Sequence, residues 1–432
     1  MPRRGLHTIR TLAVRRLIWV GTARPEVARN LRWYWLDGVF SQASEVILGS
    51  YFTLFVLALG ASRGQIAALS SVTNLTVALP LLPGAALVER FGHRKRLCLW
   101  SGGYAGRLIL IAMALLPALL QGPALVNAIL VLAVLRAALS NLGSPAWTSL
   151  TADLIPAGLR GRFLSARNIA MGIVGMVMVY ATGQFINRVG TPIGYQWAIA
   201  AAFALGMVAT WGFSHIQEPP ISHHTPAGQQ ETLVTAIREI RSSSLFLRFC
   251  GADALWNFSL NVAGPFFSVY LVEGLGATTT IVGTLSVINA VAAVPGQRLF
   301  GRLTDRWGPR RVQVLTGLLI PLLPLAWLVA PSAWHLVPVE VASGFLWAGY
   351  GLASFNTLLH VTPEARRPRY IAIYQIVVTA SMALGAAVGG LIVTRWGDHA
   401  VFAVSGVGRF LAAVLFAVLV KLPRHVSQAE EN

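Results

Sequence analysis

Long apolar runs alternate with short polar breaks along almost the whole chain. Each run has roughly twenty residues, which is enough for a helix to cross a ~30 Å hydrocarbon layer. The runs occupy residues 35–58, 66–87, 97–119, 124–151, 169–186, 196–213, 249–272, 281–300, 312–329, 337–361, 370–394 and 401–420. Because lipid offers the backbone no hydrogen-bond partners, runs of this kind are expected to be helical. The pattern predicts an all-α membrane protein with twelve transmembrane helices.

Composition agrees with a membrane protein and argues against several other classes. Charged residues make up 12% of the chain, whereas a soluble domain has about 25%. The net charge of +18 is typical of nucleic-acid binding, but the arginines lie in short breaks between apolar runs, so no nucleic-acid partner is expected. The sequence contains no Ser/His/Asp set, metal-ligand cluster or phosphate-binding loop. We therefore expect neither an enzyme nor a metal or other cofactor.

The distribution of arginines predicts the orientation of the helices. Eight arginines stand in the first 33 residues, and others follow the second and fourth spans, whereas the opposite loops hold only Arg63, Arg188 and Arg395. The positive-inside rule then places both termini on the cytoplasmic side of a membrane, for which we expect the bacterial plasma membrane. Residues 6–20 of the basic tail have an apolar helical face that suits anionic lipid headgroups, although the acid-poor start also fits a transit peptide.

An internal repeat divides the chain into two halves. LRWYWLD at 31–37 aligns with LRFCGAD at 247–253, and GRLTDRWGPRR at 301–311 has a less regular copy, AALVERFGHRK, at 85–95. Asp305 stands 216 positions after Glu89. The repeat predicts two pseudo-symmetric six-helix bundles. The expected parts are a basic tail (1–33), an N-terminal bundle (34–213), a cytoplasmic linker (214–245), a C-terminal bundle (246–420) and a second tail (421–432).

These features resemble the major facilitator superfamily over nearly the whole length. The family signature G-x-L-x-D-R-x-G-x-R-R lies between the second and third helices of each half. The second copy matches it with Gly301, Leu303, Asp305, Arg306, Gly308, Arg310 and Arg311. The first copy keeps Arg90, Gly92, Arg94 and Lys95, with Ala85 in place of the opening glycine and Glu89 in place of the aspartate. The resemblance implies a cytoplasmic charge cluster that closes the inner side in one state. The alternative is that these arginines only set the topology.

Charged residues inside the predicted spans are candidates for function, because burying them in a membrane is costly. Asp37, Ser41 and Glu45 lie on one face of the first span, and Asp253, Asn257 and Asn261 repeat this spacing in the seventh. The resemblance implies that both stripes face a central cavity. For Asp37 and Asp253, interaction with a helix N-terminus is an equally good explanation.

Arginines in other spans extend the list of candidates. Leu132 and Arg136 are similar to the start of the motif of proton-coupled members, although Leu139 and Ser140 replace the Gln and Gly that follow. We expect Arg136 to pair with Glu45, either for coupling or as a purely structural pair. For Arg107 and Arg409 we expect packing or partner contacts rather than substrate binding.

The resemblance implies a secondary transporter that moves a small-molecule substrate by alternating access. Proton coupling is expected, with Glu45 as the proton carrier and Arg136 as its partner. The alternative is a non-transporting relative that assembles a membrane complex or delivers a lipid or pigment. Charge clusters in both halves favour the transporter, since a scaffold has no gate to hold closed.

Overall fold

The computed structural model describes residues 25–218, 243–363 and 367–421, and this part of the chain is helical and contains no strand. Nine of its helical segments are long and apolar enough to cross a membrane. One of them, Tyr370–Leu419, contains two of the twelve predicted spans. The predicted spans at 66–87 and 249–272 correspond to helices that are interrupted. The prediction of an all-α membrane fold is confirmed.

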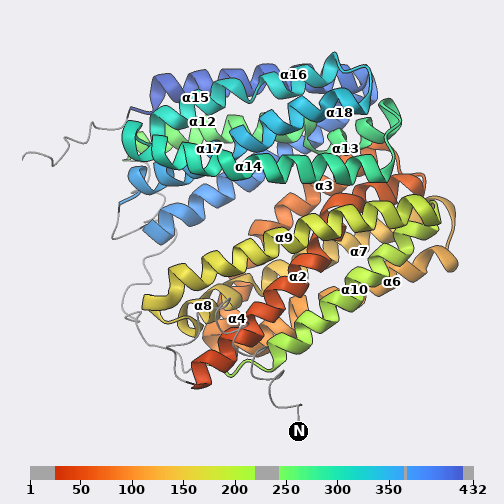
Figure 1. Ribbon diagram of the computed structural model, residues 1–432, viewed down its shortest axis with the longest axis vertical. Helices are drawn as coiled ribbons and strands as arrows, with labels where there is room; N and C mark the ends of the chain where they lie inside the picture. The colour runs from red at the N-terminus through yellow and green to blue at the C-terminus, as the bar shows by residue number, and fades with distance from the viewer. Residues whose placement is uncertain (1–24, 219–242, 364–366, 422–432) are drawn as a thin grey trace, which may run out of the picture. The chain divides into compact units, whose positions relative to one another are not determined.

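The first compact unit comprises residues up to Ser62, Leu75–Pro226 and Thr278–Thr284. In it α2 (Pro25–Ala58) packs against α9 (Ala157–Val189) and α10 (Ile193–Ser214), as Figure 1 shows. Two segments, α4 (Leu81–Phe91) and α8 (Ser144–Leu154), contact each other, and α7 (Gly122–Leu142) contacts α6 (Gly106–Leu115). Short segments complete the unit: α5 (Arg94–Cys98), the π-helical η1 (Leu99–Ala105) and η2 (Leu116–Ala118).

The second compact unit comprises Arg63–Asn74, Ala227–Ala277 and Leu285–Asn432. Its centre is the pair α12 (Ser244–Ala263) and α18 (Arg367–Leu419), with α17 (Val337–Val361) packed on α15 (Pro309–Leu319). The remaining elements are α3 (Arg63–Ala78), η3 (Gly264–Phe266), α13 (Phe267–Val269), η4 (Tyr270–Gly274), α14 (Thr279–Trp307), α16 (Leu322–Leu328) and η5 (Ala333–Leu336). Arg63–Asn74 belongs to the predicted N-terminal bundle but is grouped with the second unit. Thr278–Thr284 belongs to the predicted C-terminal bundle but is grouped with the first unit.

Glycines end or bend helices where the chain must turn between spans. Gly92 has φ 65° and closes α4 by donating its N–H to the Val88 carbonyl at 2.9 Å. Gly397 has φ 78° inside α18, which separates the two spans that this long helix contains. Only glycine adopts such angles without strain from a Cβ atom. The polar breaks of the sequence thus correspond to real turns.

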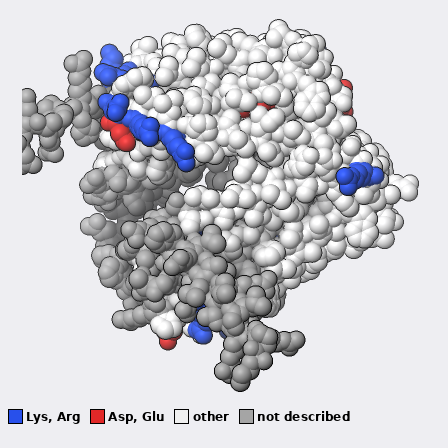
Figure 2. Space-filling view, viewed as in Figure 1, with Lys and Arg blue, Asp and Glu red and all other residues white. Residues whose placement is uncertain are grey.

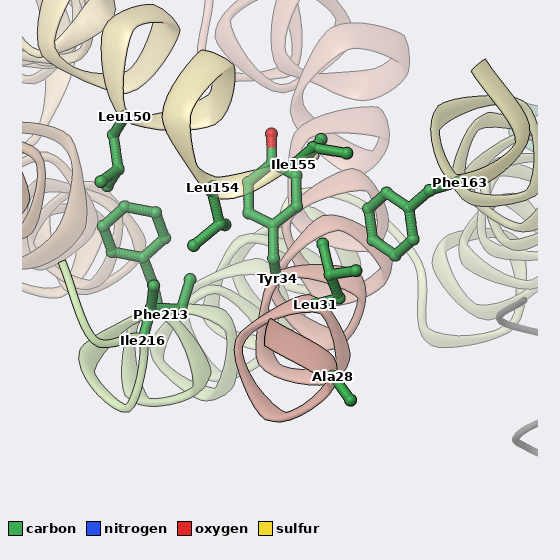
Figure 3. Packing of buried hydrophobic residues seen from close by; sticks show 9 residues of the cluster. All are labelled: Ala28, Leu31, Tyr34, Leu150, Leu154, Ile155, Phe163, Phe213 and Ile216. Atoms are coloured by element: carbon green, nitrogen blue, oxygen red, sulfur yellow. The ribbon is translucent and has the colours of Figure 1, made fainter. Parts of the chain in front are cut away.

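One apolar cluster of the first unit lies where α2, α8, α9 and the end of α10 meet (Figure 3). Its buried members are Ala28, Leu31, Tyr34, Leu150, Leu154, Ile155, Phe163, Phe213 and Ile216. The Tyr34 hydroxyl hydrogen-bonds the Thr151 hydroxyl at 2.9 Å, so the one polar atom of this ring is satisfied. This cluster holds the end of α2 that leads to the charged stripe.

The surface is apolar over large areas. Leu391, Val131 and Trp396 are 69%, 66% and 66% exposed. On the face drawn in Figure 2, most of the surface that is not grey is uncharged, and the charged side chains form a few small groups. An uncharged surface of this kind suits contact with lipid tails.

Several predicted segments lie elsewhere than expected or outside the described residues. Helix α2 begins at Pro25, about ten residues before the predicted span, because a helix continues beyond the hydrocarbon layer. The apolar face at 6–20 and most of the linker at 214–245 lie outside the described residues. The boundaries of the five predicted parts stay a prediction.

Candidate functional site

A cavity of about 430 Å³ lies inside the first unit, between α2, η1, α6, α7, α8, α9 and α10. Its volume falls in the range of small-molecule sites. Its polar lining residues are Asp37, Ser41, Gln42, Glu45, Ser101, Arg107, Ser140, Asn141, Ser144, Arg167 and Thr210. Trp147, Met171 and Phe213 add apolar surface. The cavity therefore combines polar and charged side chains with apolar surface, within a bundle of membrane helices.

The charged stripe of α2 forms one wall of this cavity. Its three members lie four residues apart, so the helix brings them onto one face. The Ser41 hydroxyl donates to Asp37 Oδ1 at 3.3 Å. The same hydroxyl accepts a hydrogen bond of 2.9 Å from Nη2 of Arg107. Ser41 thus connects an acidic and a basic group that do not bond each other directly.

Glu45 and Arg136 form an ion pair at this wall. Arg136 Nη2 donates to Glu45 Oε1 across the space between α7 and α2. The Glu45 side chain is 51% exposed and that of Arg136 is 17% exposed. Nε of Arg136 is buried and has no hydrogen-bond partner among the described residues. The pair expected from the sequence is present in this structure.

Arg107, for which we expected packing or partner contacts rather than substrate binding, lines the cavity. Arg107 follows the π-helical segment η1 directly, near the start of α6. Whether it binds substrate stays a prediction. Gly206 of α10 also makes room for Arg107, since a Cβ atom there would lie 1.9 Å from its Nη1. Nε and Nη1 of Arg107 are buried without a hydrogen-bond partner in the described part of the chain.

Asp37 lies beside Arg167, an arginine that the sequence assigned only to a basic loop. Their closest charged atoms, Asp37 Oδ2 and Arg167 Nη2, are 3.8 Å apart. Arg167 also donates Nε to the Tyr34 carbonyl at 3.3 Å and stacks over the Tyr34 ring at 4.4 Å. The sequence around Arg167 does not predict its contact with Asp37, because this contact depends on how α9 crosses α2.

The second stripe does not line this cavity, and its Asp253 and Asn261 are buried. Asp253 is 3% exposed and accepts hydrogen bonds from Tyr374 at 2.6 Å, Asn257 at 2.9 Å and Tyr350 at 3.4 Å. Asn261 donates to the Asn257 carbonyl at 3.2 Å. Three neutral donors therefore surround the Asp253 carboxyl, and within the described residues it forms no ion pair.

The interpretation of Asp37 and Asp253 as residues at helix N-termini is wrong. Asp37 lies about three turns after the start of α2 at Pro25, and α12 begins at Ser244, well before Asp253. The macrodipole acts within the first turn, so it does not explain either carboxyl. The error arose because the start of an apolar run was taken as the start of the helix.

The first copy of the signature contains a buried ion cluster. Arg94 is 1% exposed and bonds Asp153 at 2.5 Å, Glu218 at 3.2 Å and Ser149 at 3.0 Å. Asp153 ends α8 and Glu218 follows α10, so one arginine ties two helix ends together. The sequence analysis did not predict Asp153 or Glu218 as partners of Arg94. The side chain of Glu89 lies outside what the structure describes.

The second copy has a different arrangement. Arg310, which corresponds to Arg94 in the repeat, donates to the carbonyls of Ala417 and Val420 at the end of α18. Gly308 has φ 81° and leads into α15. Asp305, Arg306 and Arg311 are exposed, and Asp305 forms no ion pair within the described part. Among the described residues, Asp305 thus has no part in an ion pair of the predicted cytoplasmic charge cluster, and its role there stays a prediction.

A further ion cluster, which the sequence did not indicate, lies in the second unit. Arg63, at the start of α3, bonds Asp398 at 2.6 Å and Glu273 at 3.1 Å. Arg63 belongs to the first repeat of the sequence, whereas Glu273 and Asp398 both belong to the second repeat. Among the described residues no group of three His, Cys, Asp or Glu side chains lies close enough to hold a metal ion.

Comparison with known proteins gives one consistent family. A family model described as the Major Facilitator Superfamily matches residues 35–264 and 254–432. An uncharacterized MFS-type transporter of Bacillus subtilis, YttB, is 30% identical over 154 residues, which are 34% of this chain and 35% of that protein. The multi-drug resistance efflux pump PmrA of Streptococcus pneumoniae is 23% identical over 167 residues, which are 38% and 41% of the two chains. The matched stretches thus span well under two thirds of these relatives.

Solved structures resemble this chain over more of its length. A D-xylose-proton symporter superposes with a TM-score of 0.68 at 18% identity and covers 91% of this chain and 98% of its own. The nucleoside transporter NupG superposes with a TM-score of 0.72 at 13% identity and covers 91% and 100%. At these identities the likeness shows the fold alone.

Proposed function

This chain belongs to the Major Facilitator Superfamily and is an integral membrane transporter, and on that premise we propose that it moves a small solute by proton-coupled alternating access. Glu45 is the proton carrier in this proposal, and Arg136 is its partner. The cavity of the first unit contributes to the substrate path. The fold, the cavity and the charged wall on α2 support the proposal together.

The observation that carries the proposal is the Glu45–Arg136 ion pair at the cavity wall. A nearby guanidinium stabilises the charged form of a carboxyl, and a low-dielectric environment disfavours it. Glu45 lies about five and a half turns along α2 and is half-exposed toward the cavity, so a proton can reach it. A carboxyl in this position binds or releases a proton according to whether the pair is formed.

The pair links proton binding to movement of the helices that carry it. Glu45 belongs to α2 and Arg136 to α7, so a small change in the distance between these helices breaks the pair. The Glu45 carboxylate then loses its counter-charge and takes up a proton. When the helices return, Arg136 displaces the proton. A pair that stayed closed in every state would not couple transport to protons.

Replacing Glu45 by Gln tests this proposal. The Glu45→Gln variant resembles the protonated form and keeps the size of the side chain, so it should fold and exchange substrate across the membrane. It should not accumulate substrate against a gradient when a pH difference is imposed. The measurement is uptake of a radiolabelled solute, identified by a thermal-shift screen, into proteoliposomes.

Glu26→Gln is the matched control, because Glu26 lies exposed in the first turn of the same helix. This variant should accumulate substrate as the unmodified protein does. Full pH-driven accumulation by the Glu45→Gln variant would exclude Glu45 as the proton carrier.

A further inference from the structure

We infer that the cavity of the first unit binds a small organic anion, a carboxylate with one negative charge, and that Arg107 binds the carboxylate. This inference names the substrate class of the transporter proposed above and rests on that proposal. It is carried by the charge balance around the cavity and by the hydrogen-bond donors of Arg107 that have no partner.

Of the three arginines around the cavity, one has no carboxylate from the described residues in contact with its guanidinium group. Asp37 has Arg167 beside it, and Glu45 is paired with Arg136. Arg107 is the third arginine, and its one hydrogen bond within the described residues goes to the neutral hydroxyl of Ser41. Three guanidinium groups therefore face two carboxylates. A ligand with a single negative charge neutralises this site.

The donors of Arg107 fit the same ligand. Nε and Nη1 are buried and have no acceptor in the part of the chain that is described. Buried polar groups in proteins nearly always have a hydrogen-bond partner, and an unsatisfied charged donor is costly. A guanidinium offers several N–H groups in one plane, which matches the two oxygens of a carboxylate better than a neutral amide or hydroxyl.

The remainder of the cavity suits a small body attached to the carboxylate. Its volume of about 430 Å³ accommodates a ligand of modest size. Trp147 and Met171 provide apolar contact, and Ser140 and Asn141 provide hydrogen-bonding groups. A cation is disfavoured because the site already has an excess of positive charge.

Binding to the purified transporter in phosphatidylcholine nanodiscs tests the inference. The probes are pairs that differ in charge but scarcely in shape: benzoate with benzamide, and lactate with lactamide. Benzylamine adds a cation of similar size. We expect at least one acid to bind roughly 10- to 100-fold more tightly than its amide, as a hydrogen bond to a charged group predicts. Benzylamine should not bind. Calorimetry measures each affinity without any transport step.

Variants of Arg107 locate the binding. Arg107→Gln should abolish the preference for the acid, whereas Arg107→Lys, which keeps the charge, should retain part of it. Arg409→Gln is the matched control, because Arg409 is also a buried arginine with an unpartnered Nε but belongs to the second unit and does not line the cavity. The control should bind the acid as tightly as the unmodified protein.

Three results would overturn the inference. Equal affinity for every acid and its amide in the unmodified protein excludes a carboxylate site, and this comparison needs no variant to fold. An acid preference that survives in Arg107→Gln places the site elsewhere. A lipid headgroup is the occupant if phosphatidylglycerol nanodiscs remove acid binding that phosphatidylcholine nanodiscs show. None of these results bears on whether Glu45 couples transport to protons, which the accumulation assay tests separately.

Discussion

At the scale of single residues, three arginines of the first unit differ in what surrounds their charge. Arg94 is held by two carboxylates, Arg167 by a carboxylate, a carbonyl and an aromatic ring, and Arg107 by one hydroxyl. The partners of each guanidinium decide its role. A fully partnered arginine stabilises the fold, whereas one with free donors is available to a ligand.

We expect Arg94→Gln to destabilise the protein, because it leaves Asp153 and Glu218 without their shared counter-charge. Breaking a buried ion pair costs about 3 kcal/mol, which lowers the melting temperature of a domain of this size by about 6–12 °C. Thermal unfolding in detergent, followed by tryptophan fluorescence, measures the change. Arg96→Gln, at an exposed position close by, should melt like the unmodified protein. Equal melting of the two variants would contradict the structural role of Arg94.

At the scale of elements, close approach of helix backbones shapes the second unit. A Cβ atom on Gly385 would lie 2.2 Å from the Phe258 carbonyl oxygen, and one on Gly389 would lie 2.1 Å from that of Val262. These glycines belong to α18 and the carbonyls to α12. Small residues let membrane helices approach in this way. Gly385 and Gly389 therefore let α12 and α18 pack closely.

Gly389→Ala should destabilise the second unit, because the new methyl group meets a backbone atom that cannot move aside as a side chain can. The expected cost is about 1–3 kcal/mol, as for other overpacked cores. Gly351→Ala is the control, since nothing lies within 4 Å of a Cβ atom at that exposed position of α17. Thermal melting of both variants under identical conditions gives the comparison. A Gly389→Ala variant as stable as the control would show that α12 and α18 are not packed this closely.

At the scale of the whole molecule, the repeat explains why corresponding residues have related roles. Arg94 and Arg310 stand 216 positions apart, and both bind at or just after the end of the last helix of their half. Other equivalent positions have diverged. Glu45 is ionisable and lies at a cavity, whereas its counterpart Asn261 is neutral and buried. The two halves thus share a fold, while equivalent positions in them carry different side chains.

Asp305→Asn tests whether the second signature is part of a gate. If Asp305 pairs with cytoplasmic arginines when the inner side closes, removing its charge should shift the resting population toward the inward-open state and leave expression intact. Labelling of single cysteines placed on each side of the membrane measures this population. Glu26→Gln removes an exposed carboxylate elsewhere and should leave labelling unchanged. Unchanged labelling in Asp305→Asn as well would remove Asp305 from the gate.

The orientation predicted from the arginines has a direct test. A reporter fused at Gly228, which lies outside the described residues, should behave as cytoplasmic, because arginine-rich segments stay on the cytoplasmic side. A reporter inserted after Gly190 should behave as external. Alkaline phosphatase and green fluorescent protein fusions at both sites measure this. Finding both positions on the same side would refute the twelve-span topology.

The sequence alone determined the helical membrane fold, the twofold repeat and the charged stripe on α2. Each of these depends on residues close together in the chain: an apolar run, a signature repeated at a constant interval, or a spacing of four residues on one helix. The pairing of Glu45 with Arg136 was also within reach, since both lie deep in predicted spans and have opposite charge.

Only the tertiary structure decided which other groups meet at the cavity. Arg107 lines it directly after a π-helical segment of the third span, and Gly206, about a hundred residues later, leaves room for its side chain. Arg167 reaches Asp37 through the crossing of α9 and α2, and Asp253 is enclosed by tyrosines from α17 and α18. Such contacts depend on how helices cross, and local periodicity does not encode crossing angles or distances.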